Sequence, residues 1–112
     1  MVLYHYTTEP NMWAIVGSGI LRPSRARAGS KDVRYGNGQY LSDIAPGTLA
    51  LTQLARALSG MPFIWRRFTH FVAIEVSGWE VIRCRPGVFL VPGNFALSLE
   101  DRIVAYGRLD NE

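Results

Sequence analysis

Val33-Arg-Tyr-Gly-Asn-Gly-Gln-Tyr-Leu-Ser-Asp43 is the stretch around which we expect the fold to be organised. Gly36 and Gly38 have no Cβ, so the backbone there can take positive φ and pass close to a ligand or to another strand. The residues that follow alternate as in a strand, which puts Tyr40 and Ser42 on one face. The stretch therefore predicts a glycine turn leading into a short strand, in which Tyr40 is either a packed aromatic or part of a site.

The composition indicates one globular domain over residues 1–112. Hydrophobic residues make up 48% and charged residues 19% of the chain, which is not typical of disorder. The apolar runs are too short to span a bilayer, so we expect no membrane partner. No basic segment followed by an apolar one opens the chain, and we therefore expect no secretory signal in it.

A metal site is not expected. The single cysteine, Cys84, cannot form an internal disulfide and excludes a metal cluster built on cysteines. The two histidines, His5 and His70, lack the i, i+4 spacing of paired imidazole ligands.

The basic residues cluster in sequence, and the net charge is +3. One loop holds Arg22, Arg25, Arg27 and Lys31, with Arg34 just beyond it, and a second group is the pair Arg66 and Arg67. These charges are either solvated or meet an anion such as a pyrophosphate or a nucleic acid. Aromatic residues are not interleaved with the arginines of the loop as in a stacking platform for single strands, which favours a pyrophosphate.

The N-terminal segment predicts a strand and a short helix. Residues 2–7 are aromatic and β-branched, with Leu3, His5 and Thr7 on one face and the tyrosines on the other. Thr8 is an expected N-cap, and a glycine at 17 or 19 ends the helix.

The rest of the chain predicts one more helix and several strands. Pro46-Gly47 opens a helix of about three turns, with its apolar stripe at residues 51, 54, 55 and 58, and Gly60-Met-Pro62 ends it. Strands are expected at 69–76, 79–84, 88–91 and 102–106, with a loop at 92–101. The prediction is a mixed α+β domain, mostly sheet, with two small helices.

Several segments together resemble the ADP-ribosyltransferase superfamily, on its diphtheria-toxin and poly(ADP-ribose) polymerase side. They are Leu3-Tyr-His-Tyr-Thr7, Ile20-Leu-Arg-Pro-Ser24 and Tyr35-Gly-Asn-Gly-Gln-Tyr-Leu-Ser-Asp43. With Thr69-His-Phe-Val-Ala-Ile-Glu-Val-Ser-Gly78, Arg85-Pro-Gly-Val-Phe-Leu-Val-Pro-Gly93 and Arg102-Ile-Val104, the chain is similar to the small H-Y-D signature domains of polymorphic bacterial toxins.

The resemblance implies two small antiparallel sheets that form a cleft for NAD, which is the substrate. It implies that His5 hydrogen-bonds a ribose hydroxyl, that the backbone of Tyr6 holds the nicotinamide carboxamide, and that Tyr40 stacks on the nicotinamide ring. We expect the rings of His5 and Tyr40 to face each other across one crevice. Further NAD-binding residues expected from the resemblance are Thr7, Gly38, Thr48 and Arg34.

The catalytic acid is expected at Glu75 or Asp43. Better-known relatives carry a glutamate in a late strand, but the comparable segment Val88-Phe-Leu-Val91 has no acid. Glu75 lies in a predicted central strand, where an unpaired carboxylate would be costly to bury unless it had a function. Asp43 is the second candidate, with an N-cap for the following helix as its alternative, and Glu100 is the third.

The sequence thus predicts a mono-ADP-ribosyltransferase toxin domain that uses NAD and carries His5, Tyr40, Glu75 and Asp43 as its catalytic residues. The resemblance implies a secreted parent protein, action in the target-cell cytoplasm and an immunity protein as partner, but it identifies no acceptor. The alternatives are an NAD glycohydrolase, a non-catalytic NAD or ADP-ribose binder, and a basic toxin directed at RNA.

Overall fold

A computed structural model describes residues 1–23 and 36–109. Its helices are α1 (Glu9–Ser18), α2 (Leu51–Ser59) and the 3-10 helix η2 (Pro62–Phe68). Its strands are β1 (Val2–Thr7), β2 (Ile20–Leu21), β3 (Gly38–Leu41), β4 (His70–Glu75), β5 (Ile82–Arg85), β6 (Val88–Pro92), β7 (Leu97–Ser98) and β8 (Ile103–Arg108). The α+β class is as predicted, and the sheets are small and antiparallel.

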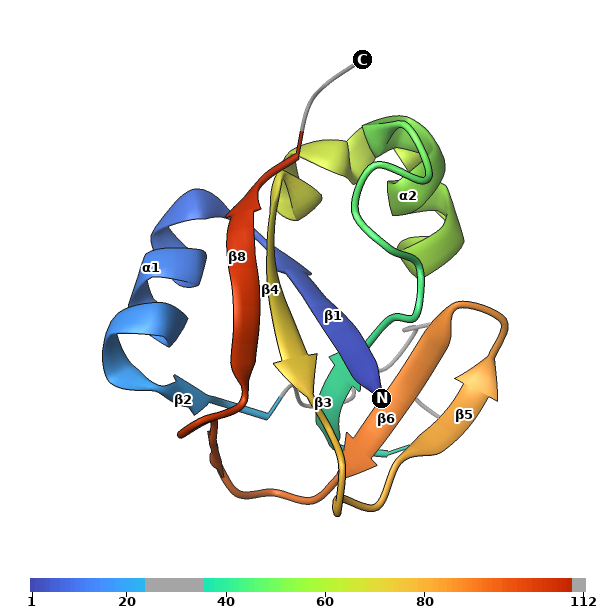
Figure 1. Cartoon of the computed structure of the whole chain (residues 1–112). Helices are drawn as coiled ribbons and strands as arrows, with labels where there is room; N and C mark the ends of the chain where they lie inside the picture. The colour runs from blue at the N-terminus through green and yellow to red at the C-terminus, as the bar shows by residue number, and fades with distance from the viewer. Residues whose placement is uncertain (24–35, 110–112) are drawn as a thin grey trace.

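The first sheet has the order β1-β4-β8, with β4 in the centre (Figure 1). His5 of β1 pairs with Val72 of β4, and this register runs from Val2↔Glu75 to Thr7↔His70. The strand predicted at 69–76 is therefore confirmed. It is central because its residues are apolar on both faces, so that both faces can be covered.

Helices cover the two faces of the first sheet. Met12 and Ile15 of α1 pack with Leu3, Val72 and Ile74 in one core cluster. On the other side, a second cluster joins Leu51 and Leu54 of α2 to Tyr6, Leu109 and the partly buried Tyr4 and Phe71. The alternation of β1 thus directs its tyrosines toward α2, and Leu3, His5 and Thr7 toward α1.

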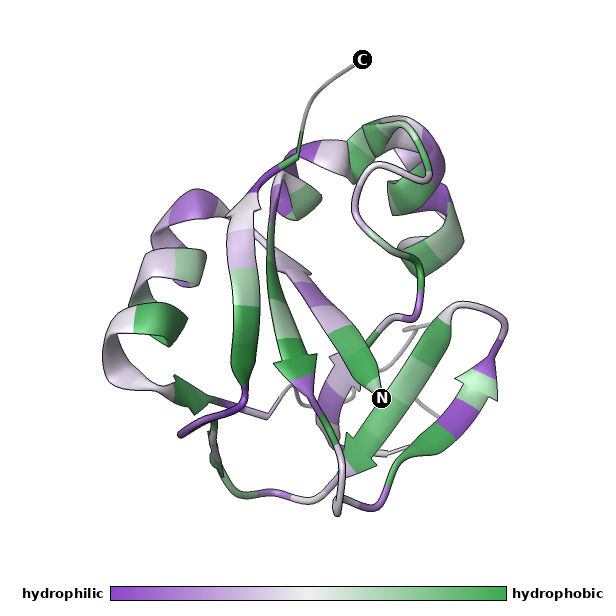
Figure 2. Cartoon of the chain, in the orientation of Figure 1, coloured by the Kyte–Doolittle hydropathy of each residue, from purple (hydrophilic) through white to green (hydrophobic). Residues whose placement is uncertain are grey.

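The second sheet has the order β3-β6-β5 and depends on Gly38. Gly38 has φ +154°, and a Cβ there would lie 2.3 Å from the carbonyl oxygen of Val91 in β6. Of the two uses expected for this glycine, the close approach to another strand is therefore the one observed. Most of β6 is hydrophobic (Figure 2), and Val88, Leu90 and Val91 are buried.

The two sheets meet at a single bridge between β1 and β3. The N–H of Tyr4 donates to the carbonyl of Ser42 at 2.8 Å, and the N–H of Ser42 donates to the carbonyl of Tyr4 at 2.9 Å. A third sheet, β2-β7, has only the pairs Ile20↔Ser98 and Leu21↔Leu97. The sequence did not predict this third sheet, because two-residue strands carry no periodicity.

The helices depart from the prediction at three points. Thr8 is the N-cap of α1 but makes no side-chain capping bond, while Gly19 ends the helix in the left-handed conformation as expected. α2 begins at Leu51 and not at Pro46-Gly47, and its N-cap is Ala50. η2 was not predicted, although Pro62 opens it in the first turn. Within the described residues, no helix is long and apolar enough to cross a bilayer.

Candidate active site

The edge of β1 that faces β3 opens at Tyr6. Backbone groups of successive residues in an antiparallel strand point to alternate sides. The backbone groups of Tyr4 point toward β3, where they pair with Ser42. Those of the odd-numbered residues point the other way, as the carbonyl of Met1 shows by accepting from the N–H of Val76, just after β4, at 3.0 Å. The N–H and C=O of Tyr6 therefore point toward β3, just past the bridge, where no described backbone group pairs with them.

His5 lies beside this opening with an unsatisfied ring. Its Nδ1 is inaccessible to solvent and has no hydrogen-bond partner among the described residues. Burial lowers the pKa of His5 from 6.5 to about 4, and a hydrogen bond with the backbone of Tyr40 opposes part of that shift. The imidazole is therefore neutral at physiological pH, and its unpartnered Nδ1 can pair with a further polar group.

His5 lines a pocket of about 450 Å³ between β1, α1 and β2, which we call the His5 pocket. Thr7, which was expected to bind NAD, lines it too. The polar side chains on its other walls come from Asn11, Ser18 and Arg22. Asn11 and Ser18 are two helical turns apart and so share a face of α1, a spacing that could have identified them in the sequence.

Tyr40 lines a smaller pocket of about 120 Å³ on the α2 side of β1, which we call the Tyr40 pocket. Its other lining residues are mostly aromatic or aliphatic: Tyr4, Tyr6, Leu41, Ser42, Leu58, Phe68 and Val88. The Tyr40 hydroxyl donates to the carbonyl of Gly36, and the Tyr6 hydroxyl donates to that of Ile44. Burial, with a smaller contribution from Tyr4, raises the pKa of Tyr6. The two hydroxyl hydrogen bonds hold both rings in place.

The expectation of one crevice between the rings of His5 and Tyr40 is wrong. The two rings line different pockets, on opposite sides of β1, and Tyr6 lines both pockets. The alternation of side chains along β1 is the reason, because His5 points toward α1 while Tyr4 and Tyr6 face Tyr40. What the fold brings together is the His5 ring, the backbone of Tyr40 and the open backbone edge of Tyr6.

Two of the other expected NAD-binding residues lie elsewhere. Gly38 packs against β6 and lines neither pocket. Thr48 lines a separate pocket with Arg108 and the residues that precede α2, and neither His5 nor Tyr40 lines that pocket. Arg34 lies outside the described residues, as do Arg25, Arg27 and Lys31, so that Arg22 is the one described member of this basic loop.

Glu75 is not the buried strand carboxylate that we expected. It ends β4 with 40% of its side chain exposed. His5 pairs with Val72 and Glu75 pairs with Val2, so they are three positions apart along the ladder. An odd separation puts the two side chains on opposite faces of the sheet.

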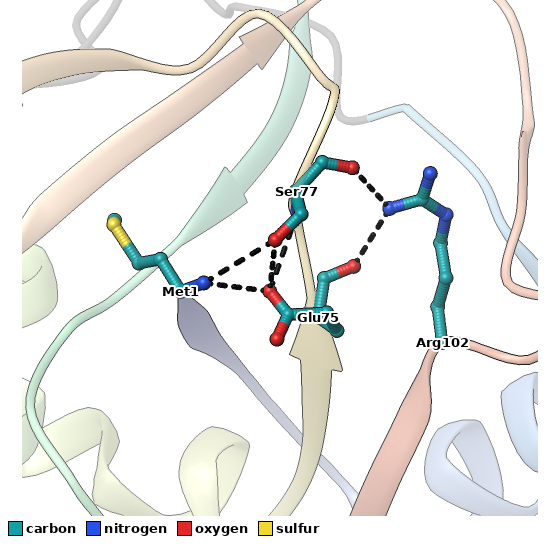
Figure 3. A network of polar contacts seen from close by, with 4 residues as sticks. All are labelled: Met1, Glu75, Ser77 and Arg102. Carbon is teal, nitrogen blue, oxygen red and sulfur yellow. Dashed lines mark hydrogen bonds and ion pairs between the residues drawn. The ribbon is translucent and has the colours of Figure 1, made fainter.

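The carboxylate of Glu75 belongs to a surface network (Figure 3). It accepts from the α-amino group of Met1 at 2.7 Å and from the hydroxyl of Ser77 at 2.8 Å. These two hydrogen bonds, the first more than the second, lower the pKa of Glu75 to about 2. Arg102 closes the network by donating to the carbonyls of Glu75 and Ser77, both at 2.9 Å, while its guanidinium lies 4.4 Å from the Trp79 ring centre.

Asp43 is exposed and directly follows Ser42, which lines the Tyr40 pocket. It is not the N-cap of α2, since Ala50 has that position. Its other neighbour, Ile44, accepts the hydrogen bond from Tyr6. Glu100 is exposed and lines a pocket between α1 and β7, which neither His5 nor Tyr40 lines but which shares Ser18 and Ile20 with the His5 pocket.

The site thus consists of a mostly apolar pocket at Tyr40 and a more polar pocket at His5, with Tyr6 in both. Among the described residues, no group of His, Cys, Asp and Glu could hold a metal ion. A family model described as HYD1 signature containing ADP-ribosyltransferase matches residues 3–103 of the 112-residue chain. No curated protein and no solved structure matches the chain.

Proposed function

Because the chain belongs to the HYD1 signature family of ADP-ribosyltransferase toxin domains, we propose that it cleaves NAD between nicotinamide and ribose and transfers ADP-ribose to an acceptor. The observation that carries the proposal is the open backbone edge of Tyr6, flanked by the unsatisfied His5 ring and by Tyr40. A carboxamide has one donor group and one acceptor, which are what the C=O and N–H of a strand residue can pair with.

NAD would cross β1 at this edge. Its nicotinamide would enter the Tyr40 pocket, between aromatic rings, with its carboxamide on the backbone of Tyr6. The remainder would lie in the larger His5 pocket. In support, Tyr6 lines both pockets, and their volumes of about 120 and 450 Å³ follow the sizes of the two parts of NAD.

His5 would hold a ribose hydroxyl, and Arg22 would meet the pyrophosphate. A neutral imidazole with a buried, unpartnered nitrogen has capacity for a hydroxyl that no described protein group uses. Thr7 and Asn11 line the same pocket. Arg34 stays a prediction for the pyrophosphate, and Gly38 and Thr48 have no support from their surroundings.

Of the two expected acids, we favour Asp43 as the catalytic carboxylate. Departure of nicotinamide takes the electron pair of the glycosidic bond and leaves a cationic sugar, which a nearby carboxylate stabilises. The acceptor then bonds to the anomeric carbon and gives its proton to the carboxylate. Asp43 follows the wall of the Tyr40 pocket and has no hydrogen bond among the described residues, whereas Glu75 is already paired.

The decisive experiment follows both products of labelled NAD. The domain is incubated with NAD alone and then with cell lysate, while free nicotinamide and ADP-ribose bound to protein or RNA are measured. A transferase releases nicotinamide slowly until acceptor is added, and the label then becomes covalently bound. Rapid release with free ADP-ribose as the product would instead identify a glycohydrolase.

Two substitutions at Tyr40 provide a matched control. Tyr40→Phe keeps the ring for stacking and is expected to retain most of the activity, while Tyr40→Ala is expected to lose it. Equal activity of Tyr40→Ala and the wild type would contradict the placement of nicotinamide. NAD binding without cleavage would indicate a non-catalytic binder.

The biological setting of the proposal follows from the toxin family. We infer that the domain acts as a secreted effector in the cytoplasm of a target cell. A cognate immunity protein would then have to block the His5 and Tyr40 pockets. Co-purification of such a protein, with loss of NAD binding in the complex, would test this inference.

A further inference from the structure

Gln39 is a buried polar residue whose side chain joins three segments that are distant in sequence. It belongs to β3, next to Tyr40, and is 2% exposed. Its Nε2 donates to the carbonyl of Leu21 at 3.2 Å and to that of Phe95 at 3.0 Å. Because both partners are carbonyl oxygens, they determine which end of the amide faces them.

The strand that Gln39 contacts has few backbone hydrogen bonds, although its Leu21 side chain is buried in the core cluster. β2 consists of Ile20 and Leu21, and among the described residues it pairs with the two residues of β7. One more backbone bond, from Leu99 to the carbonyl of Gly19 at 2.7 Å, adjoins this ladder. A ladder of this length is marginal by itself, so the position of the β2 backbone depends on the core packing of Leu21 and on the bond from Gln39 to the Leu21 carbonyl.

β2 is also a wall of the His5 pocket. Ile20, Leu21 and the following Arg22 line this pocket, while Gln39 itself does not. β3 has an independent anchor, since its register with β6 includes Gln39↔Val91 and Tyr40↔Leu90. Loss of the Gln39 side chain would thus release β2 and leave Tyr40 in position.

We propose that Gln39 is a positioning residue for NAD, which sets the place of β2 and Arg22 and thereby the width of the His5 pocket. The inference rests on the proposed function, because it assigns this pocket to the part of NAD remote from the bond that breaks. We expect β2 and Arg22 to contribute equally to binding of the ground state and the transition state, because neither is assigned to the bond that breaks. Loss of this contribution raises KM and leaves kcat unchanged.

The test uses Gln39→Met, which keeps the side-chain length without a donor, and Gln39→Glu, whose carboxylate repels both carbonyls. We expect KM for NAD to rise about tenfold in Gln39→Met and further in Gln39→Glu. We expect kcat to stay within about twofold of the wild type. Gln39→Asn, which is too short to reach both carbonyls, serves if either variant does not fold.

Gln53→Met is the matched control, because it makes the same chemical change at an exposed glutamine. Gln53 accepts from the N–H of Ala50 at 3.0 Å, at the start of α2. Its loss is expected to weaken that helix end without changing KM for NAD. A merely structural role of Gln39 would likewise lower stability and leave KM unchanged, and that result would overturn the proposal.

Hydrogen–deuterium exchange of residues 20–22 gives a readout independent of activity. Faster exchange there in Gln39→Met, with unchanged exchange in β6, is the expected result. Unchanged exchange in β2, or a fall in kcat with constant KM, would overturn the positioning role. If the wild type neither binds nor cleaves NAD, the proposed function fails, whereas the exchange data still report whether Gln39 holds β2.

Discussion

The two ends of the ladder between β1 and β4 differ in how far their polar groups are satisfied. Near the bridge to β3, the Nδ1 of His5 is buried and has no described partner. At the opposite end, the carboxylate of Glu75 has two donors within 2.8 Å and is partly exposed. Both residues have strongly shifted pKa values, yet the causes are desolvation for His5 and hydrogen bonding for Glu75.

The comparison teaches that a shifted pKa does not by itself indicate a catalytic group. The shift of Glu75 is what a surface ion pair produces, and its Oε2 already accepts hydrogen bonds from Met1 and Ser77. The shift of His5 comes from burial that the hydrogen bond with the Tyr40 backbone only partly offsets, and its Nδ1 is left without a described partner. Folding does not favour such a buried polar atom unless a ligand supplies the missing partner. The His5 end is therefore where we place the chemistry.

The largest expected effect compares two carboxylates. Asp43→Asn should lower NAD cleavage by roughly a thousandfold, as expected for loss of a proton-accepting catalytic group. Glu75→Gln should stay within about twofold, because its carboxylate belongs to the Met1 and Ser77 network. Nicotinamide release by both variants is the measurement, and the reverse order would restore Glu75 as the catalytic acid.

His5→Ala should lower NAD turnover on the order of a hundredfold, through the loss of one positioned hydrogen bond at the ribose. His5 does not belong to the apolar core cluster that contains its neighbours Leu3 and Val72, so the variant should fold. Calorimetric titration with NAD and circular dichroism separate loss of binding from loss of structure. Wild-type affinity in His5→Ala would contradict the ribose contact.

The pH dependence of stability should separate the two ends. The native state binds fewer protons than the unfolded state wherever the native pKa is lowered, so the unfolding free energy falls as pH falls. His5 contributes this loss between pH 6.5 and about 4. Glu75 contributes it between pH 4.5 and about 2.

Urea unfolding at a series of pH values checks these two ranges. His5→Gln should remove the loss in the upper range and keep the lower one, while Glu75→Gln should do the opposite. A wild-type profile that is flat between pH 6.5 and 4 would show that His5 titrates normally.

The smallest effect on activity is expected for Tyr6→Phe. The proposed contact with nicotinamide uses the backbone of Tyr6, so turnover should stay within about twofold. The carbonyl of Ile44 loses its donor, and stability should fall by about 1 kcal/mol. Thermal unfolding and kinetics together check this prediction, and a large loss of turnover would move the role of Tyr6 to its hydroxyl.

The sequence predicted the parts of the fold in which hydrophobic residues recur at a regular spacing or a glycine ends a helix. The first strand, the central strand and the stop of α1 at Gly19 agree with it, because alternation and the left-handed glycine leave clear patterns. The start of α2 was wrong, since a Pro-Gly pair fits a turn as well as a first helical turn. β2 and β7 leave no pattern, because pairing with distant residues creates them.

The candidate site was predictable in its members more than in its geometry. His5, Tyr6, Thr7 and Tyr40 line the two pockets, and their roles toward NAD stay predictions. The crevice and the burial of Glu75 were wrong, because both depend on strand register. Register decides which faces oppose each other and where β4 ends, and one sequence does not reveal it.

The packing of Gly38 bears on how a genetic screen of this domain should be interpreted. Any side chain at this position meets the main chain of Val91, so every replacement would distort β3 and the neighbouring Tyr40. A selection for loss of toxicity will therefore recover Gly38 substitutions as readily as those of residues that touch the substrate. In such a survey, substitutions of Gly38 report on the assembly of the second sheet, whereas substitutions of His5 report on the proposed recognition of NAD.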